Sequence, residues 1–171
     1  KKTVSIKGER MNNTCIYSDM IINEDTIRVY NIHLASNWFK NTDYSFIQNP
    51  QKEKIKEGII GITKRMKSSF IKRAEEVEII KQHMADCTYP IIVCGDFNDT
   101  PLSYAYNSIK GDLSDAFSIS GKGIGDSFVK ISALRIDYIL HDNDLKSSNY
   151  QKHKQVLSDH YAVSCEIEIG N

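Results

Sequence analysis

The stretch "IIVCGDFNDTP", which runs from Ile91 to Pro101, decides how this chain of 171 residues folds. It starts with four apolar residues, as in a strand buried on both faces, and these end at a glycine. Asp96, Asn98 and Asp99 then follow in quick succession. This pattern predicts either a glycine and Asx turn that caps the next helix, or a polar site held by a rigid strand.

The segments before this stretch predict a hairpin and two helices. Residues 15–22 and 26–34 have strand patterns, and the polar cluster 23–25 between them has the length of a hairpin turn. Apolar residues recur at helical spacing over 55–66 and again over 70–86. The apolar stripe of the second helix consists of Phe70, Ala74, Val77, Ile80 and Met84.

Two more strands are predicted after the stretch, namely "RIDYIL" (135–140) and "HYAVSCEIEI" (160–169). In the last strand, apolar and polar residues alternate as they do in a half-buried strand. Helices that lead into buried strands indicate a layered α/β or α+β domain. The length is ordinary for one domain, so we expect residues 1–171 to belong to a single one.

Composition limits the classes of function. Lys and Arg together number 22, as do Asp and Glu, so no overall charge attracts the chain to nucleic acid or to an anionic membrane. Any binding of a polyanion must come from a local patch. The four cysteines form no CxxC pair, which favours free thiols over a zinc site. We expect no membrane segment, because no run approaches the roughly 18 apolar residues of a spanning helix.

Polar residues interrupt the strand patterns at four places. In chain order they are Asn31 with His33, Asp96 with Asn98, Asp137, and Asp159 with His160. The first two places stand at the C-terminal ends of their strands, and the last two at the N-terminal ends. If the first two strands run opposite to the last two, all of these side chains gather at one edge of the layered structure.

Each place alone has a structural explanation, as a strand end or a helix cap. Asp137 is harder to explain in this way, because a carboxylate inside an apolar strand is costly without a partner. Together, carboxylates, histidines and an amide suit a hard divalent cation such as Mg²⁺ or Mn²⁺ and an oxyanion substrate such as a phosphate ester. Asp96 is then the type of residue that activates water, while His160 and Asn98 are the types that contact a phosphate.

Four motifs, "VYNIHL", "IIVCGDFNDTP", "RIDYIL" and "LSDHYAV", occur in this order and resemble the endonuclease/exonuclease/phosphatase superfamily. The resemblance extends from about Tyr30 to the C-terminus. It implies an α/β (α+β) fold, specifically a four-layered α/β sandwich of the deoxyribonuclease I-like type. It also implies the hydrolysis of a phosphoester with a divalent cation.

The resemblance implies a role for each polar residue. His33 would contact or protonate the scissile phosphate, and Asn31 would support it. Asp96 would activate or orient the attacking water. Asn98 would donate a hydrogen bond to the phosphate.

Three further residues follow from the motifs around the last two strands. Asp137 would hold the ring of His160, which fixes its tautomer and favours the imidazolium next to the phosphate. Asp159 would bind the divalent cation. Ser127 and its neighbour Phe128 would line the substrate cleft.

Members of the superfamily carry a longer segment before the "NIH" motif, including a glutamate that binds the metal. This chain starts too late to hold that glutamate, which implies that residues 1–171 are a domain truncated at its N-terminus. We therefore expect the chain alone to bind Mg²⁺ weakly and to have weak activity or none. We also expect the surface that the missing part covers to be exposed or covered by another copy.

The substrate stays open at this point. Lys and Arg are in excess between Lys40 and Arg73, which could follow a phosphate backbone, although a solvated helix face explains most of them. Arg73 is the residue of this group that we expect to bind substrate phosphate. Aromatic residues after the "NIH" motif could stack on a base, contact a lipid or pack the loop, and they are Trp38, Phe39, Tyr44 and Phe46.

The sequence thus favours a divalent-metal-dependent phosphodiesterase, with nucleic acid as one candidate substrate. A lipid or inositol phosphate hydrolase is the alternative within the same chemistry. A non-catalytic binding module, which kept the fold and the motifs without a complete metal site, is the alternative from another class.

Overall fold

The computed structural model describes residues 2–4, 14–37, 39–49 and 55–170, and the structural statements below concern those residues. Trp38, one of the aromatic residues named above, lies outside them. The elements, in chain order, are β1 (Lys2–Val4), β2 (Thr14–Ile22), β3 (Asp25–His33), α1 (Asn41–Gln48), α2 (Ile55–Ala85), β4 (Ile91–Asp96), α3 (Tyr104–Lys110), β5 (Ser114–Asp115), α4 (Ala116–Ser120), β6 (Asp137–His141), β7 (Lys146–His153) and β8 (Ala162–Glu168).

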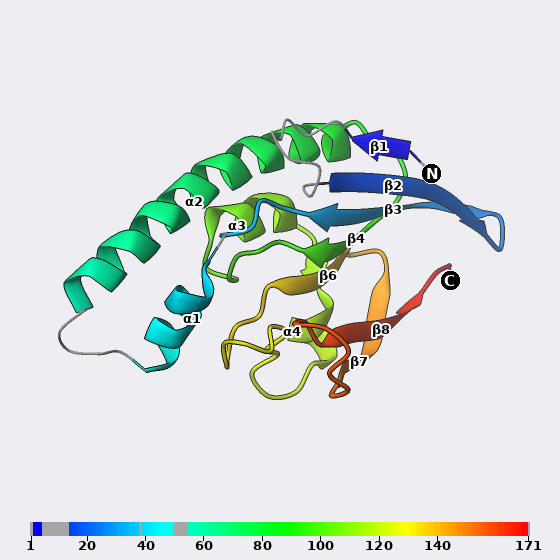
Figure 1. Ribbon diagram of the computed structural model, residues 1–171. Coiled ribbons are helices and arrows are strands. Elements are labelled where there is room, and N and C mark those ends of the chain that lie inside the picture. The colour runs from blue at the N-terminus through cyan, green and yellow to red at the C-terminus, as the bar shows by residue number, and fades with distance from the viewer. Residues whose placement is uncertain (1, 5–13, 38, 50–54, 171) are drawn as a thin grey trace.

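The strands form two sheets. Six of them lie in the order β1-β2-β3-β4-β6-β5, in which only the pair β3 and β4 is parallel, and β7 pairs with β8 in a second, antiparallel sheet. Helices α2 and α3 lie on one side of the six-stranded sheet, and the β7–β8 pair lies on the other side near β6 (Figure 1). The predicted mixed α/β architecture is confirmed.

The core lies between α2, α3 and the six-stranded sheet. Tyr30 and Ile32 of β3, Val93 of β4, and Val77 and Ile80 of α2 have no exposed surface. Because successive side chains of a strand point to opposite faces, the other face of β3 carries Asn31 and His33. That face ends at the sheet edge described below.

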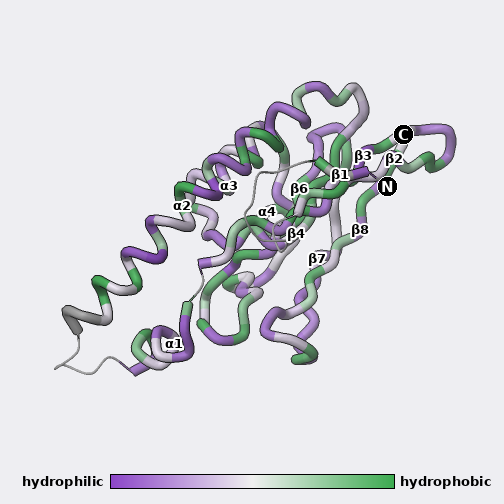
Figure 2. The backbone as a smooth tube through the Cα atoms, turned by 45° about the horizontal axis from the view of Figure 1, so that its top comes forward, coloured by the Kyte–Doolittle hydropathy of each residue, from purple (hydrophilic) through white to green (hydrophobic). Residues whose placement is uncertain are grey.

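Helix α2 differs from the prediction in two respects. Where two helices were expected, one helix runs from Ile55 to Ala85, and Figure 2 shows hydrophobic and hydrophilic residues following each other around its turns. Ser69, at the expected break, is buried, and its Oγ donates to the carbonyl oxygen of Ser36 at 2.9 Å. Phe70, expected in the buried stripe, is 42% exposed, whereas Arg73 and Glu76 are buried. The packed face therefore includes polar residues, which an apolar periodicity cannot reveal.

The predicted terminal strand is confirmed as β8, but its partner β7 was not predicted. Strand β7 has the sequence KSSNYQKH, in which only Ser147 and Tyr150 are buried, and its register with β8 shifts between Ser148 and Gln151. Because an irregular strand with few apolar residues lacks the alternation of a half-buried one, its sequence carries no strand signal.

Glycine is required at position 95. Gly95 has φ +141°, and a Cβ atom there would lie 1.9 Å from the carbonyl oxygen of Ile32 on the parallel strand β3. No side chain fits at that distance, so glycine permits β3 and β4 to remain paired up to their last residues. The apolar run of β4 therefore stops where the backbone of β3 comes closest, one residue before Asp96.

The β2–β3 hairpin turns through Asn23 and Glu24, both of which have positive φ values, +50° and +76°. Two central residues with positive φ are the mark of a type I′ turn, which prefers Asn-Gly. We expect Glu24→Gly to raise the free energy of unfolding by about 0.5–1 kcal/mol, because glycine adopts this conformation without strain. Urea unfolding of both proteins measures the change, and an unchanged or lower stability would contradict the assignment of the turn.

Two expectations from composition concern membranes and thiols. In the part of the chain that the structure describes, no helix has the length and apolarity needed to cross a bilayer. All four cysteines are free thiols, as predicted, and burial raises the pKa of Cys15 to about 12.

Candidate active site

The sheet edge where β3 and β4 end and β6 begins carries most of the predicted polar residues. Strands β3 and β4 are parallel, with His33 opposite Asp96, and β6 is antiparallel to β4, with Asp137 opposite Asp96. The segment before β8 reaches the same edge through a bridge between Phe128 and His160. The strand directions thus bring these groups together, as expected.

His160 and Asp137 form a hydrogen-bonded pair. His160 Nδ1 lies 2.8 Å from Asp137 Oδ2, and its other ring nitrogen, Nε2, lies 3.8 Å from Asp96 Oδ2. The hydrogen bond to Asp137 raises the pKa of His160 above its ordinary value, against the opposing effect of burial. The ring of Phe128 packs against the imidazole at a centroid distance of 5.2 Å. The imidazolium is therefore favoured and held in one orientation.

The Asp96 carboxylate is held by Asn98 on both oxygens. Oδ1 accepts from the backbone N–H of Asn98 at 2.7 Å, and Oδ2 accepts from its side-chain Nδ2 at 3.0 Å. Burial, followed by the charge of Asp137, raises the pKa of Asp96 to about 6, although the Asn98 hydrogen bond and both nearby histidines lower it. His33 Nε2 is 3.6 Å from Oδ2. A carboxyl group with this pKa is suited to accept a proton from water.

We expect Asp137→Asn to lower the pKa of His160. The substitution removes the charged hydrogen-bond acceptor and leaves burial, which opposes protonation, as the larger influence. An NMR titration of the His160 ring protons measures the change, with the exposed His153 as an internal reference. The matched control is Asp126→Asn, which removes the salt-bridge partner of Lys152. An unchanged His160 pKa would contradict the pairing.

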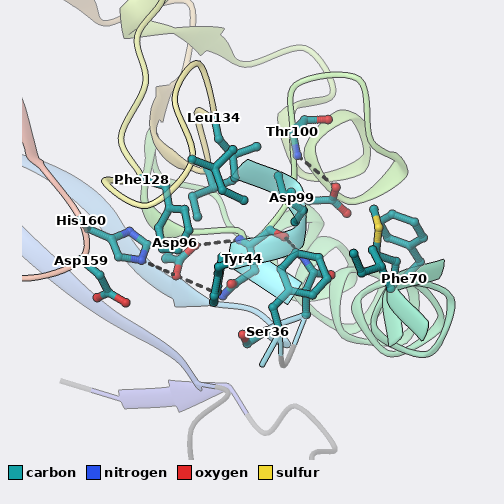
Figure 3. A pocket seen from close by; sticks show the side chains of 18 of the residues that line it. Ser36, Tyr44, Phe70, Asp96, Asp99, Thr100, Phe128, Leu134, Asp159 and His160 are labelled. Atoms are coloured by element: carbon teal, nitrogen blue, oxygen red, sulfur yellow. Dashed lines mark hydrogen bonds and ion pairs between the residues drawn. The ribbon is translucent and has the colours of Figure 1, made fainter. Parts of the chain in front are cut away.

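A cleft of about 620 Å³ opens beside this cluster (Figure 3). His160 and Asp159 lie on one side of it and Phe70 of α2 lies on the other (Figure 3). Its polar lining consists of His33, Ser36, Asn37, Asp96, Asn98, Asp99, Thr100, Asp159 and His160. The cleft therefore contains His33, Asp96 and His160 at one end, with room for a bound molecule next to them.

The polar cluster has donors that fit a divalent cation. Asp96, Asp137 and His160 each offer one ligand atom, and these atoms lie within 4.8 Å of one another. Asp159, the predicted metal ligand, also lines the cleft, and its carboxylate is 51% exposed and 3.1 Å from the ammonium of Lys130. That hydrogen bond lowers the pKa of Asp159. Carboxylates with one imidazole suit Mg²⁺ or Mn²⁺ better than a soft metal.

Arg73 does not lie where the sequence predicted. Its side chain has no exposed surface, and its guanidinium donates to Asp99 Oδ2 at 2.9 Å, to the carbonyl oxygen of Ala35 at 2.6 Å and to Asn37 Oδ1 at 3.1 Å. A fully buried guanidinium with these partners cannot contact a substrate phosphate. Arg73 instead ties the loop after β3 to the loop after β4.

Ser127 is a second correction. It is completely buried, and its Oγ accepts hydrogen bonds from the backbone N–H groups of Ile136 and Asp137, both at 3.0 Å. It therefore holds the start of β6 and does not line the cleft, whereas its neighbour Phe128 does.

Asn31 and Asn98 also differ from their expected surroundings. Asn31 is exposed and lines a separate hollow between β4, β6 and β8, outside the cleft. The side-chain Nδ2 of Asn98 donates to the carbonyl oxygen of Leu34 at 3.0 Å and to Asp96. Asn98 thus orients the carboxylate in this structure, and its contact with a phosphate stays a prediction.

Asn37 and Lys130 belong to the surroundings of the cleft but were not predicted from the sequence. Asn37 lines the cleft and accepts from Arg73, while Lys130 pairs with Asp159 and lies over the ring of Tyr44, 5.2 Å from its centroid. Asn37 follows the "NIH" motif closely, which was the one available signal. Lys130 lies in an irregular segment whose position depends on tertiary packing, so no local pattern could have indicated it.

Three solved structures illustrate what the chain resembles. A mannosyl-6-phosphatase of Bacteroides thetaiotaomicron is 15% identical, with a TM-score of 0.59, and the match covers 92% of this chain and 57% of that one. The human Nocturnin catalytic domain is 16% identical, with a TM-score of 0.55, and the match covers 93% of this chain and 54% of that one. A humanized D. rerio TDP2 is 12% identical, with a TM-score of 0.60, and the match covers 98% of this chain and 63% of that one. At these identities the likeness establishes the fold. The chain spans only 54% to 63% of the length of these structures.

Two comparisons with known sequences concern the family of the chain. No curated protein sequence matches the chain significantly. Residues 66–160, which contain the "GDFN", "RIDYIL" and "SDH" motifs, match the Endonuclease/Exonuclease/phosphatase family. Because this match covers more than half of the residues, the chain belongs to the Endonuclease/Exonuclease/phosphatase family.

Proposed function

We propose that this chain carries the catalytic groups of a divalent-metal-dependent phosphoester hydrolase. The observation that carries the proposal is the arrangement around Asp96, where a half-buried carboxylate faces the Nε2 atoms of His33 and His160 at 3.6 and 3.8 Å. A general base next to two potential cations is the set that attack by water on a phosphate requires.

Each residue has a task that follows from its surroundings. Asp96 accepts a proton from the attacking water, because burial has raised its pKa into the range of a useful base. His160, kept protonated by Asp137, neutralises charge on the non-bridging oxygens. His33, on the other side of Asp96, contacts the phosphate or protonates the leaving group.

A divalent cation completes the site in this proposal. The carboxylates of Asp96 and Asp137, together with Asp159 at the mouth of the cleft, would hold it, because the protonated ring of His160 has no lone pair for a metal. When bound, Mg²⁺ or Mn²⁺ would neutralise phosphate charge and lower the pKa of a bound water. The likeness to a protein named mannosyl-6-phosphatase supports phosphoester chemistry in this fold without indicating a substrate for this chain.

The test measures hydrolysis of bis(p-nitrophenyl) phosphate and p-nitrophenyl phosphate with Mg²⁺ or Mn²⁺. It compares this chain with the longest protein encoded by its gene, each as wild type and with Asp96→Ala or His160→Ala. Asp112→Ala, which removes an exposed carboxylate elsewhere, is the matched control. Metal-dependent activity that only the two site variants lose supports the proposal. Activity that survives both variants contradicts it, and inactivity of every wild-type sample favours the binding module.

A further inference from the structure

The cleft beside Asp96 has an apolar wall, of which the proposed chemistry uses only Phe128, packed against the His160 ring. This apolar wall comes from three segments, namely residues 39–47 in and before α1, the N-terminal half of α2 and the loop 128–136. Its residues are Phe39, Tyr44, Ile47, Ile62, Met66, Phe70, Phe128, Ile131, Leu134 and Ile136. Apolar side chains therefore make up about half of the lining, and they lie on both sides of the cleft, with Phe70 across from His160 and Phe128 beside it (Figure 3).

The wall is held together by polar contacts behind it. Asp43 of α1 is buried and pairs with Arg65 of α2, which fixes one helix against the other. Gln48, at the end of α1, donates its Nε2 hydrogen to the carbonyl oxygen of Lys130 at 2.9 Å. The ammonium of Lys130 in turn lies over the ring of Tyr44. Three segments distant in sequence are thus tied into one surface.

The charges of the residues that line the cleft do not favour a polyanion bound along this wall. Among the described lining residues none is Lys or Arg, whereas three are aspartates. The lysines of α2 that could attract a phosphate backbone, Lys64, Lys67 and Lys72, are exposed and line no part of the cleft. A nucleic-acid strand needs cationic side chains along its phosphates, so the wall lacks what such a strand requires.

We propose that the substrate of this site is a phosphoester whose phosphate is joined to an apolar group, and that this group binds the apolar wall. The inference rests on the proposed function for the position of the phosphate. Burial of apolar ligand surface in a preformed apolar cleft is favourable, whereas a small polar alcohol would leave the wall exposed to water. The apolar group is an alkyl chain or an aromatic ring, both of which the wall would accept.

The test uses phosphonates, which are not hydrolysed, so that binding is measured separately from catalysis. Methyl-, butyl-, octyl- and phenylphosphonate are titrated into the chain by calorimetry with Mg²⁺ present. We expect the affinity to rise roughly fourfold for each methylene that the wall buries. If phenylphosphonate binds as tightly as octylphosphonate, the apolar group of the substrate is an aromatic ring. If phenylphosphonate binds more weakly, the group is an alkyl chain. Affinity independent of the organic group, or exceeded by that of a mononucleotide, would overturn the inference.

Variants of the wall give a second readout. Ile62→Asn and Met66→Gln should each remove most of the gain of octylphosphonate over methylphosphonate. Ile71→Asn, on the same helix but outside the cleft and 53% exposed, is the matched control and should leave that gain unchanged. Equal effects of all three substitutions would overturn the inference.

The two proposals can fail independently. If phosphonate affinity rises with alkyl length but no phosphoester is hydrolysed, the proposed function is wrong and the apolar binding site is supported. If Asp96→Ala abolishes hydrolysis but phosphonate affinity does not depend on alkyl length, the proposed function is supported and the apolar binding site is wrong.

Discussion

Replacing Asp96 by asparagine is expected to stabilise the folded chain at neutral pH while removing its proposed catalytic base. Burial and the neighbouring Asp137 raise the pKa of Asp96 from 3.8 to about 6, so the folded state pays for each ionised carboxylate at pH 7. That difference corresponds to about 3 kcal/mol. The lost hydrogen bond between Asn98 Nδ2 and Asp96 Oδ2 offsets about 1 kcal/mol, which leaves a gain of about 2 kcal/mol.

The pH dependence of this gain has a definite sign. Because the folded pKa is raised, the destabilisation by Asp96 is complete above pH 6, fades between pH 6 and 4, and is absent when the carboxyl group is protonated in both states. The asparagine variant should therefore be more stable than the wild type at pH 7.5, and the two should converge as the pH falls towards 4. Urea unfolding at several pH values measures this.

The same substitution should lower metal-dependent phosphoester hydrolysis by roughly 10²–10⁴-fold, since a positioned general base contributes about that much. Asp112→Asn, in an exposed position, is the control for both measurements and should change neither stability nor activity. A variant that is less stable than the wild type at pH 7.5 would show that the carboxylate is stabilised in the folded chain, and the assignment of Asp96 as a base with a raised pKa would fall.

Arg73→Met is expected to destabilise the chain by about 3–5 kcal/mol. The guanidinium is fully buried with Asp99, whose side chain is 9% exposed, and its removal leaves a buried carboxylate without its cation. Burial lowers the pKa of Arg73, and Asp99 counteracts this, which shows how closely the two charges depend on each other. Denaturant unfolding gives the magnitude.

Matched variants separate the ion pair from the loss of a large side chain. Lys72→Met, one residue away on the exposed side of α2, should change the stability by no more than about 0.5 kcal/mol. The double variant Arg73→Met/Asp99→Asn should recover part of the loss, because it removes the uncompensated charge. If the double variant is no more stable than Arg73→Met, the side chain acts through packing and not through its charge.

The loss should extend to the site. Arg73 contacts Ala35 and Asn37 after β3 as well as Asp99 after β4, so its removal frees the two loops that follow His33 and Asp96. In NMR spectra of the folded fraction, the backbone signals of residues 34–37 and 96–100 should shift, while those of the β7–β8 pair should not.

Local patterns were sufficient for the fold class and for the polar groups of the site. An apolar run that ends at Gly95 predicts a buried strand, and alternating residues predict β8, because each pattern reflects the environment of consecutive residues. The sequence left the relative directions of β3, β4 and β6 as a condition, and the structure fulfils it, which places His33, Asp96 and Asp137 together. The choice of residues needed only short-range information and the order of the motifs.

The tertiary structure alone decided which side chains line the cleft and which support them from behind. Arg73 and Ser127 are both polar, and the sequence offered no reason to expect them inside. Their burial depends on Asp99 and on the backbone of Ile136, to which they bind. The apolar wall joins α1, α2 and the loop 128–136 in the same way, through contacts between residues far apart in the chain. The sequence determined the fold class and the set of polar residues at the strand ends, because patterns of consecutive residues record both. Only the tertiary structure decided the surroundings of each group, because a polar residue is buried wherever distant segments supply its partners.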